Sequence, residues 1–554
     1  MSAAIFYHNE AYSINGSKLM GRNAAGESFI RGYLTYAPPS DSIWVRSLNH
    51  DDASEFSELV KKHGRAEEVI EVTQNNIGEL RNAGTLFYPG PDLGFQSFQR
   101  RLNGDNLWSL CGILHTTASA GAMDSICALS TAPIYPWDGV ICPSRAVKNN
   151  ALEIMAIQEE ELASRLGASR FHRPQMPVIP LGVHASEFDF STEEKQQARE
   201  KLNIPNESIV IIYLGRLSFH AKAHPIQMYE ALKQASRVTG KNIVLVECGW
   251  FSNASIQDSF SEAWELLCPG LERIVLDGRK QENKFLALAS GDIFCSLADN
   301  YQETFGIVPI EGMASGLPVI VSDWNGYRDT VRQAKDGFLI PTAAPGSGLF
   351  KDFAYRHAVG IDSYDRYCGY TSNFISVDLP ILISSLTELI RDETLRERLG
   401  QEGKRRANQV FDWSAIIPRY LEFWRELKDI RDRSTDGIQG ASLTISRTWP
   451  ARMDPSHTFA GYPTININSN TRVRLLLSSS DEALGKIRLY KKLMMIKFAD
   501  PILPRESDII HLLNALTAEP KLAHDLLEHV TDLKKAEILR TIGWLAKLGI
   551  VSFS

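Results

Sequence analysis

A pair of cationic side chains follows an apolar run in "IIYLGRLSFHAKAHP". Arg216 comes directly after the strand-like stretch, and Lys222 comes six residues later. A guanidinium and an ammonium at the carboxyl end of a strand form a good receptor for a diphosphate, because both carry positive charge and donate hydrogen bonds. Taken alone, the segment fits two solvated loop cations equally well.

Two glutamates lie in the otherwise apolar stretch "ETFGIVPIEGMASGLPVIVSD". A buried carboxylate costs several kcal/mol unless it has partners, so Glu311 is either paired within the protein or held for a polar ligand. Glu303 can accept hydrogen bonds from sugar hydroxyls, and Glu311 can accept two from a ribose diol. Gly306 lets the backbone approach a ligand, and N–H groups at the start of the following helix attract anionic or hydroxyl oxygens.

Short β-branched or aromatic runs that alternate with helix-like stretches indicate the elements that position these residues. In the first third the strand-like runs are "AAIFY", "SIWVRS", "TLFYPG", "LWSLCGILH", "DGVICPS" and "MPVIPLGV". The rhythm restarts with "SIVIIYLG", "NIVLVECG", "ERIVLDG", "DIFCSLA", "LPVIVSD" and "DGFLIP". Such alternation predicts parallel sheets covered by helices on both faces. The predicted fold class is therefore α/β with two doubly wound Rossmann-like domains facing a cleft, since a single core rarely grows to this size.

The predicted domain boundaries follow the composition of the chain. The polar stretch around residue 190 divides one doubly wound domain, residues 1–190, from a second, residues 191–432. Residues 433–470 are rich in Ser, Thr, Asn, Asp, Gly and Pro and predict a linker. Residues 471–554 predict a small, winged-helix-like unit of three short helices that run into a terminal strand.

Two segments of the second domain are interpreted structurally. Residues 345–374 break the alternating pattern and predict a loop insertion. The last helix of this domain carries apolar positions at helical spacing, which is more typical of a packing face than of a cofactor site. These positions are Ile416, Tyr420, Phe423, Trp424 and Leu427.

The combined motifs resemble the nucleotide-sugar-dependent family 4 glycosyltransferases of GT-B fold. In that family the second domain carries a Gly-Arg-Leu…Lys element and a Glu-x7-Glu signature. The matching residues here are Gly215, Arg216, Leu217, Lys222, Glu303 and Glu311. Supporting similarities are "GILHTT", "DGVICPSRAV", "VIPLGV" and "FDWS", so the resemblance covers roughly residues 1–430.

The resemblance implies a role for each matching position. The first domain would bind the acceptor and the second the donor, with Arg216 and Lys222 on the donor diphosphate. Glu303 and the backbone of Thr304, Phe305 and Gly306 would hold the transferred sugar. Glu311 would bind the nucleotide ribose, and His115 would face the reacting region of the sugar.

Two departures from the family pattern bear on these roles. The family spacing from the Arg to the Lys is one residue shorter, so Lys18 or Arg22 could share the work of Lys222. The segment "GSKLMGRNAAGESF", with Gly21 and Gly26, stands where the family has a glycine-rich loop near acceptor and diphosphate. It matches neither a dinucleotide fingerprint nor a Walker loop, so a plain loop-to-helix turn is the alternative.

The predicted reaction is hexosyl transfer with retention of anomeric configuration. The cations address the leaving group directly, and no well-placed carboxylate pair suggests a covalent glycosyl intermediate. The loops that would hold a metal–diphosphate clamp contain no Asp-x-Asp pair. We therefore expect no metal and no cofactor, with a nucleotide-diphosphate sugar as co-substrate and a saccharide or other small molecule as acceptor.

The composition of the chain indicates its cellular location and limits the partners that it is expected to bind. The net charge of -7 and the pI near 6.1 give no global attraction to nucleic acid or to an anionic membrane. The seven cysteines form no CxxC pair and no zinc spacing, which favours buried thiols in a reducing compartment. No secretory signal and no run of about 20 apolar residues is present, so a cytoplasmic protein is expected.

The terminal unit and two competing functions complete the predictions. Basic residues near residues 486–497 are interspersed with acids, which is more typical of a solvated face than of a DNA-binding surface. The unit could instead form a homo-oligomer or bind a peptide. The competing functions are a GT-B nucleotide-sugar epimerase and a non-catalytic sugar-nucleotide sensor whose terminal unit contacts a partner.

Overall fold

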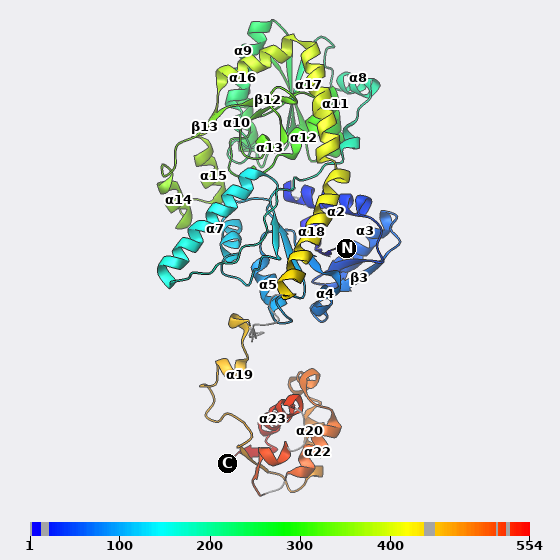
Figure 1. Cartoon of the computed structure of the whole chain (residues 1–554), viewed down its shortest axis with the longest axis vertical. Helices are drawn as coiled ribbons and strands as arrows, with labels where there is room; N and C mark the ends of the chain where they lie inside the picture. Colours follow the sequence, from blue (N-terminus) through cyan, green and yellow to red (C-terminus); the bar gives the residue numbers. More distant parts are fainter. Residues whose placement is uncertain (1–2, 13–20, 437–448, 517–518, 528–531, 554) are drawn as a thin grey trace. The chain divides into compact units, whose positions relative to one another are not determined.

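The computed structural model describes residues 3–12, 21–436, 449–516, 519–527 and 532–553. They form two compact units, Met1–Trp449 and Pro450–Ser554 (Figure 1). No helix in the described ranges is long and apolar enough to cross a membrane.

The first sheet of the larger unit is parallel and has the strand order β3-β2-β1-β4-β5-β6. Its strands are β1 (Ala4–Phe6), β2 (Ser42–Arg46), β3 (Glu68–Val72), β4 (Thr85–Phe87), β5 (Ser109–Ile113) and β6 (Gly139–Ile141). Ile5 of the central strand pairs with Val45 on one side and Phe87 on the other. This order, which reverses between β1 and β4, is that of a Rossmann sheet.

One predicted strand of this sheet is wrong. The run "MPVIPLGV" forms only isolated bridges, Cys142 with Val178 and Val183 with Asp412. Pro177 and Pro180 carry no N–H for a ladder, which explains why the run does not extend the sheet. The strand β3, at the opposite side of the sheet beside β2, was not predicted because its two glutamates interrupt the apolar run.

The second sheet contains all six predicted runs. Its order is β12-β11-β10-β7-β8-β9. Its strands are β7 (Ile209–Leu214), β8 (Ile243–Gly249), β9 (Glu272–Asp277), β10 (Ile293–Ser296), β11 (Val319–Ser322) and β12 (Gly337–Ile340). Because β7, β8, β10 and β11 are nearly continuous apolar runs, helices must cover both faces.

Helices cover both sheets (Figure 1). Those around the first sheet are α1 (Asn9–Tyr12), α2 (Gly21–Tyr36), α3 (His50–Lys62), α4 (Leu80–Ala83), α5 (Leu93–Arg101), α6 (Ala120–Ala128) and α7 (Arg145–Leu166). Those that follow are α8 (Thr192–Lys201), α9 (Ile226–Thr239), α10 (Ala254–Leu267), α11 (Gln281–Ser290), α12 (Ile307–Ala314), α13 (Tyr327–Thr330), α14 (Lys351–Ala358), α15 (Tyr364–Ser372), α16 (Leu379–Arg391), α17 (Glu393–Arg406) and α18 (Trp413–Asp436).

Helix α18 runs back from the second sheet to the first (Figure 1). The predicted aromatic stripe on α18 is confirmed as a packing face, because all five side chains are buried. A Cβ at Gly139 of β6 would overlap the ring of Phe423, so the helix lies directly on the first sheet. Near its end, Arg431 donates hydrogen bonds to the Gly84 carbonyl and the Ser109 hydroxyl.

The prediction that residues 345–374 form a loop is wrong, because much of this segment is helical. The segment forms α14 and α15 and leads into a small antiparallel pair with β13 (Thr342–Ala343) and β14 (Ser376–Val377). Ser363 caps α15 by accepting a hydrogen bond from the Arg366 N–H. A Cβ at Gly369 would lie 2.7 Å from the His220 Cβ, so the absence of a side chain lets α15 approach the loop after β7.

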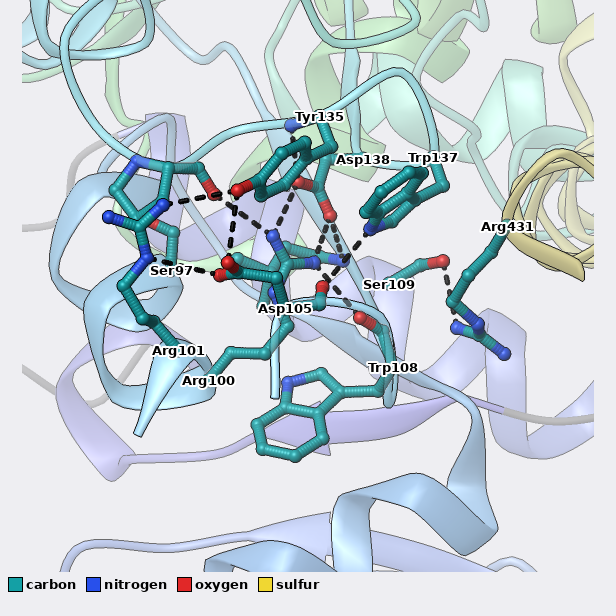
Figure 2. A network of polar contacts seen from close by, with 12 residues as sticks. Ser97, Arg100, Arg101, Asp105, Trp108, Ser109, Tyr135, Trp137, Asp138 and Arg431 are labelled. Atoms are coloured by element: carbon teal, nitrogen blue, oxygen red, sulfur yellow. Dashed lines mark hydrogen bonds and ion pairs between the residues drawn. The ribbon is translucent and has the colours of Figure 1, made fainter. Parts of the chain in front are cut away.

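A buried ion pair stabilises the end of the first sheet at which β5 and β6 begin (Figure 2). Arg100 of α5 donates two hydrogen bonds to Asp138 and further ones to the carbonyls of Trp108 and Pro133. Asp138 also accepts hydrogen bonds from the backbone N–H groups of Leu110 and Tyr135. This end of the sheet lies opposite the carboxyl ends of the strands.

The smaller unit is mostly helical with a three-stranded antiparallel sheet, β16-β15-β17. The first and third of the three predicted helices and the terminal strand are present. The second, in "KLAHDLLEHV", is wrong, because its described residues form the short strand β16 and the 3-10 turn Ala523–Leu526. The strand β15 was not predicted. Its elements are α19 (Pro455–Thr458), β15 (Arg472–Leu475), α20 (Ser480–Tyr490), α21 (Met494–Lys497), α22 (Glu506–Ala515), β16 (Lys521–Leu522), α23 (Asp532–Lys547) and β17 (Val551–Phe553). Residues 437–448 of the predicted linker lie outside the described residues.

Candidate active site

The candidate site lies where the strand order of the second sheet reverses. Strands β7 and β10 are neighbours at this point. Arg216 follows β7, and Glu303 follows β10 after a short loop. Ligands in doubly wound sheets bind beyond the carboxyl ends of the strands at such a reversal. The topology therefore brings together two motifs that are far apart in the sequence.

Glycines let the backbone pack tightly at the ends of β7 and β8. Gly215 has φ of +140°, and an added Cβ there would lie 3.7 Å from the Lys222 Cε. A Cβ at Gly249 would overlap the Gly215 carbonyl, so that position has no room for a larger residue, whereas Gly215 is favoured by its backbone conformation. Arg216 itself is half-buried and donates a hydrogen bond of 3.2 Å to the Ala221 carbonyl. The loop from Gly215 to Lys222 thus folds back on itself and carries both cations.

Lys222 and Glu303 form an ion pair between the two loops. The Lys222 Nζ lies 2.6 Å from the Glu303 Oε2. Burial alone would raise the pKa of Glu303, but the Lys222 ammonium and the N–H groups of Phe305 and Thr304 outweigh burial and lower the pKa. Glu303 is therefore an anion at neutral pH, with its charge balanced by one of the two cations.

Asp299 and Asn300 attach the same two loops to each other. The Asp299 Oδ2 accepts a hydrogen bond of 3.1 Å from the His224 N–H. The Asn300 Nδ2 donates one of 2.9 Å to the His220 carbonyl. Burial raises the pKa of Asp299 to about 7, and its Oδ1 has no hydrogen-bond partner among the described residues. The loop that carries Arg216 and Lys222 is thus attached at several points.

Replacing Asp299 by asparagine is expected to stabilise the protein at high pH more than at low pH. The folded-state pKa is raised from 3.8 to about 7, so the natural chain loses stability as the pH rises through this window. This loss in the free energy of unfolding of the natural chain amounts to at most about 4 kcal/mol. The asparagine side chain keeps an oxygen for the His224 N–H and does not titrate. The measurement is the thermal unfolding midpoint of both chains at about pH 5 and about pH 8; a difference that does not change with pH would contradict the expectation.

Glu311 is paired within the protein, which is one of the two outcomes expected from its burial. The Lys284 Nζ of α11 lies 2.8 Å from the Glu311 Oε1 and 5.2 Å from the centre of the Phe188 ring. Glu311 lies in α12, whose packing on β10 is close because a Cβ at Gly312 would contact Phe294. The second carboxylate oxygen can accept a hydrogen bond from a ligand hydroxyl.

Thr304 connects the loops of the second domain to the first domain. The Thr304 hydroxyl donates a hydrogen bond of 3.0 Å to the His115 carbonyl, at the loop after β5. The Ser144 hydroxyl donates one of 2.7 Å to the Thr304 carbonyl and caps α7 by accepting from the Val147 N–H. The tertiary structure therefore places the His115 loop beside the loop that carries Glu303.

The remaining predicted contacts of this loop are partly structural. Phe305 is buried and packs edge to face on Phe411, with ring centres 6.1 Å apart. Gly306 has φ of +91°, and a Cβ there would overlap the ring of Tyr327. The glycine is thus required by both its backbone conformation and the aromatic ring beside it. That these backbone groups bind sugar stays a prediction.

The predicted glycine-rich loop near the acceptor is helical where the structure describes it. Gly21 begins α2, and Gly26 lies within this helix. A Cβ at Gly26 would overlap the Ala11 carbonyl, so this glycine serves the packing of α2 on α1. The suggestion that Lys18 shares the work of Lys222 falls outside the described residues, as does the side chain of Arg22. Substrate binding by Gly21 and Gly26 stays a prediction.

Comparisons with known proteins agree with this geometry. Residues 194–347 match the family described as glycosyl transferases group 1, a range that contains Arg216, Lys222, Glu303 and Glu311. This part of the chain is similar to these glycosyltransferases. The match covers the part of the candidate site that the second domain contributes, and the loops of the first domain lie outside the matched range.

Curated relatives extend the resemblance at low identity. The D-inositol 3-phosphate glycosyltransferase of Corynebacterium urealyticum is 27% identical over 210 residues, 37% of this chain and 48% of that protein. The phosphatidyl-myo-inositol mannosyltransferase of Mycobacterium leprae is 28% identical over 145 residues, 26% of this chain and 28% of that protein. The chain thus spans about half of the length of the first of these relatives.

A solved structure supports the fold. The crystal structure of Anabaena Alr3699/HepE in complex with UDP matches with a TM-score of 0.50 and 15% identity. The match covers 77% of this chain and 100% of that one. The predicted GT-B arrangement of two Rossmann-like domains is confirmed.

Several residues of the site were not predicted from the sequence. Lys284 lies in an ordinary amphipathic helix, Ser144 is an ordinary helix cap, and Asp299 is one acid in a polar loop. Of these three residues, only Asp299 could have been recognised in the sequence, because it follows a buried strand directly before the Glu303 motif. The others act through partners that are distant in the chain.

Proposed function

We propose that this protein is a hexosyltransferase that moves a sugar from a nucleotide-diphosphate sugar to an acceptor with retention of configuration. The observation that carries the proposal is the convergence of Arg216, Lys222 and Glu303 at the carboxyl ends of β7 and β10. A diphosphate is the ligand that two such cations fit best, and the ion-paired carboxylate beside them fits sugar hydroxyls. The complex of HepE with UDP supports the nucleotide part of the proposal.

The donor would lie along the carboxyl edge of the second sheet. Arg216 and Lys222 bind the diphosphate, and Glu303 with the backbone of Thr304, Phe305 and Gly306 holds the sugar. Glu311 accepts hydrogen bonds from the ribose while Lys284 balances its charge. His115 lies on the acceptor side, near the bond that breaks, where Gly21 and Gly26 complete the site.

The chemical step would begin with departure of the nucleoside diphosphate. Negative charge builds up on the leaving oxygen, and preorganised cations at that place lower the barrier. The sugar ionises toward an oxocarbenium-like state, and the acceptor hydroxyl attacks from the face of the leaving group and gives its proton to the departing diphosphate oxygen. Because Arg216 and Lys222 supply the positive charge, we propose that the step proceeds without a metal and without a further cofactor.

A cytoplasmic location is part of the proposal. The seven cysteines are free, and six of them are buried. Burial raises the pKa of several of these thiols to about 12, as for Cys111, Cys248 and Cys295. Inert, unpaired thiols are typical of proteins from a reducing compartment.

Calorimetric titration with UDP, GDP and ADP tests the proposed donor site. The natural chain is expected to bind at least one of these nucleotides, and Glu311→Ala is expected to weaken that binding about 10- to 100-fold by removing a charged ribose acceptor. A matched control is Glu402→Ala, which removes an exposed glutamate on α17 that pairs with Arg405 and Arg332. This control should bind nucleotide as the natural chain does.

A deoxynucleotide makes the test specific for the role of Glu311. A 2′-deoxynucleoside diphosphate should bind the natural chain more weakly than the ribonucleotide, and Glu311→Ala should no longer distinguish the two. The absence of binding by all three nucleotides would contradict the proposal. Donor assays with the same nucleotides as sugar conjugates separate the competing functions, since an epimerase releases nucleotide without an acceptor and a sensor releases none.

A further inference from the structure

An exposed apolar segment, residues 489–502, lies in the smaller unit. Within it six large apolar side chains are at least half exposed. They are Leu489 (58%), Leu493 (50%), Met494 (78%), Met495 (79%), Phe498 (86%) and Ile502 (79%). Single exposed apolar residues are ordinary, but a cluster within so short a segment marks an interaction surface.

The exposed apolar segment is held in place by its own turns and by the core of the unit. The Phe498 N–H donates to the Met494 carbonyl at 2.9 Å, and the Ile502 N–H donates to the Ala499 carbonyl at 3.0 Å. Tyr490 and Ile496 pack against the buried core of the smaller unit. The segment is therefore anchored on one side while its methionines, Phe498 and Ile502 are exposed to solvent.

Positive charge accompanies the exposed apolar side chains. Lys491, Lys492 and Lys497 lie within the segment, and Arg505 follows it. Its one carboxylate, Asp500, is 3.4 Å from the Lys491 Nζ and is thereby neutralised. Lys492 and Lys497 are exposed, and neither has an ion pair among the described residues. The surface thus combines insertable apolar groups with uncompensated cations.

We propose that the exposed apolar segment docks this protein on the surface of an anionic lipid bilayer. Met494, Met495, Phe498 and Ile502 enter the boundary between headgroups and acyl chains, while Lys492 and Lys497 contact lipid phosphates. Interfacial segments combine these two features, since apolar burial and attraction to anionic lipid act together. Long lysine stems also reach from an apolar surface to the polar headgroups.

Charge complementarity favours a bilayer over the other possible occupants. A second copy of the segment would bring the same cations face to face, which is unfavourable. A nucleic acid would use the lysines but would leave the methionines and Ile502 exposed to water, because those side chains neither stack on bases nor bind phosphate. An anionic bilayer satisfies both sets of side chains at once.

Sedimentation of the full chain with lipid vesicles tests the proposal. We expect binding to vesicles of phosphatidylcholine that contain phosphatidylglycerol, and little binding to phosphatidylcholine alone. The Met495→Ser/Phe498→Ser variant should lower the partition coefficient by about ten-fold or more. The Lys492→Glu/Lys497→Glu variant should lower it at least about five-fold for each lysine removed and should abolish the dependence on salt.

A matched control and a measurement of oligomeric state make the test decisive. Tyr462→Ser removes an aromatic side chain that is 84% exposed in a stretch, residues 454–471, without Lys or Arg. This variant should bind vesicles as the natural chain does. Equal vesicle binding by the natural chain and the apolar variant would overturn the proposal. So would a dimer, detected by analytical ultracentrifugation, that the apolar variant abolishes, since it would assign the surface to a second copy.

Discussion

Replacing Arg216 by alanine is expected to lower kcat by about 100- to 1,000-fold or more. The guanidinium follows β7 at the reversal of the sheet and stands beside Lys222, whose charge is shared with Glu303. Arg216 is therefore the cation with the least internal neutralisation at this point. Because leaving-group charge develops only as the bond breaks, the loss should appear in kcat more than in KM.

The measurement is steady-state kinetics with the donor that the calorimetric screen identifies. Arg405→Ala is the matched control, because its exposed guanidinium on α17 contacts Glu402 and Gln409. It should leave kcat unchanged. Arg216→Lys should recover part of the loss, since it restores the charge without the planar fork. Near-normal turnover by a folded Arg216→Ala variant would contradict the proposed mechanism.

Replacing Asp138 by alanine is expected to lower the free energy of unfolding by about 3–5 kcal/mol. The variant leaves the fully buried Arg100 guanidinium without its counter-ion (Figure 2). It also leaves the N–H groups of Leu110 and Tyr135 without their acceptor. A buried charge without a partner is among the most destabilising changes that a single substitution can make.

Denaturant unfolding followed by circular dichroism measures this loss. Asp277→Ala is the control, because the ion pair of Asp277 with Arg279 is exposed and should contribute about 0–1 kcal/mol. The folded fraction of Asp138→Ala should bind nucleotide as the natural chain does. The network around Asp138 lies at the amino ends of β5 and β6, opposite the carboxyl ends of the strands. A loss below about 1 kcal/mol would show that the pair is not needed for stability.

The amino-acid sequence by itself determined the second sheet and the location of its candidate ligand-binding residues. Most of its six strands are continuous apolar runs, which a sheet buried on both faces requires and which a solvent-exposed segment rarely contains. Arg216, Glu303 and Gly306 stand shortly beyond such runs, so their place at the carboxyl edge followed from the direction of the strands. The apolar stripe of α18 was predictable for a similar reason, because helical spacing identifies a buried face.

Only the tertiary structure decided which groups meet. Lys284 reaches Glu311 from another helix, Ser144 holds Thr304 from the other domain, and Asp299 contacts the backbone of a loop that precedes it by many residues. The edge strand β3 and the helices α14 and α15 likewise depend on neighbours, since their sequences are partly polar and carry no long apolar run. Local composition indicates whether a segment is buried or exposed to water. Contacts between side chains that are distant in the sequence depend instead on how the chain folds between them.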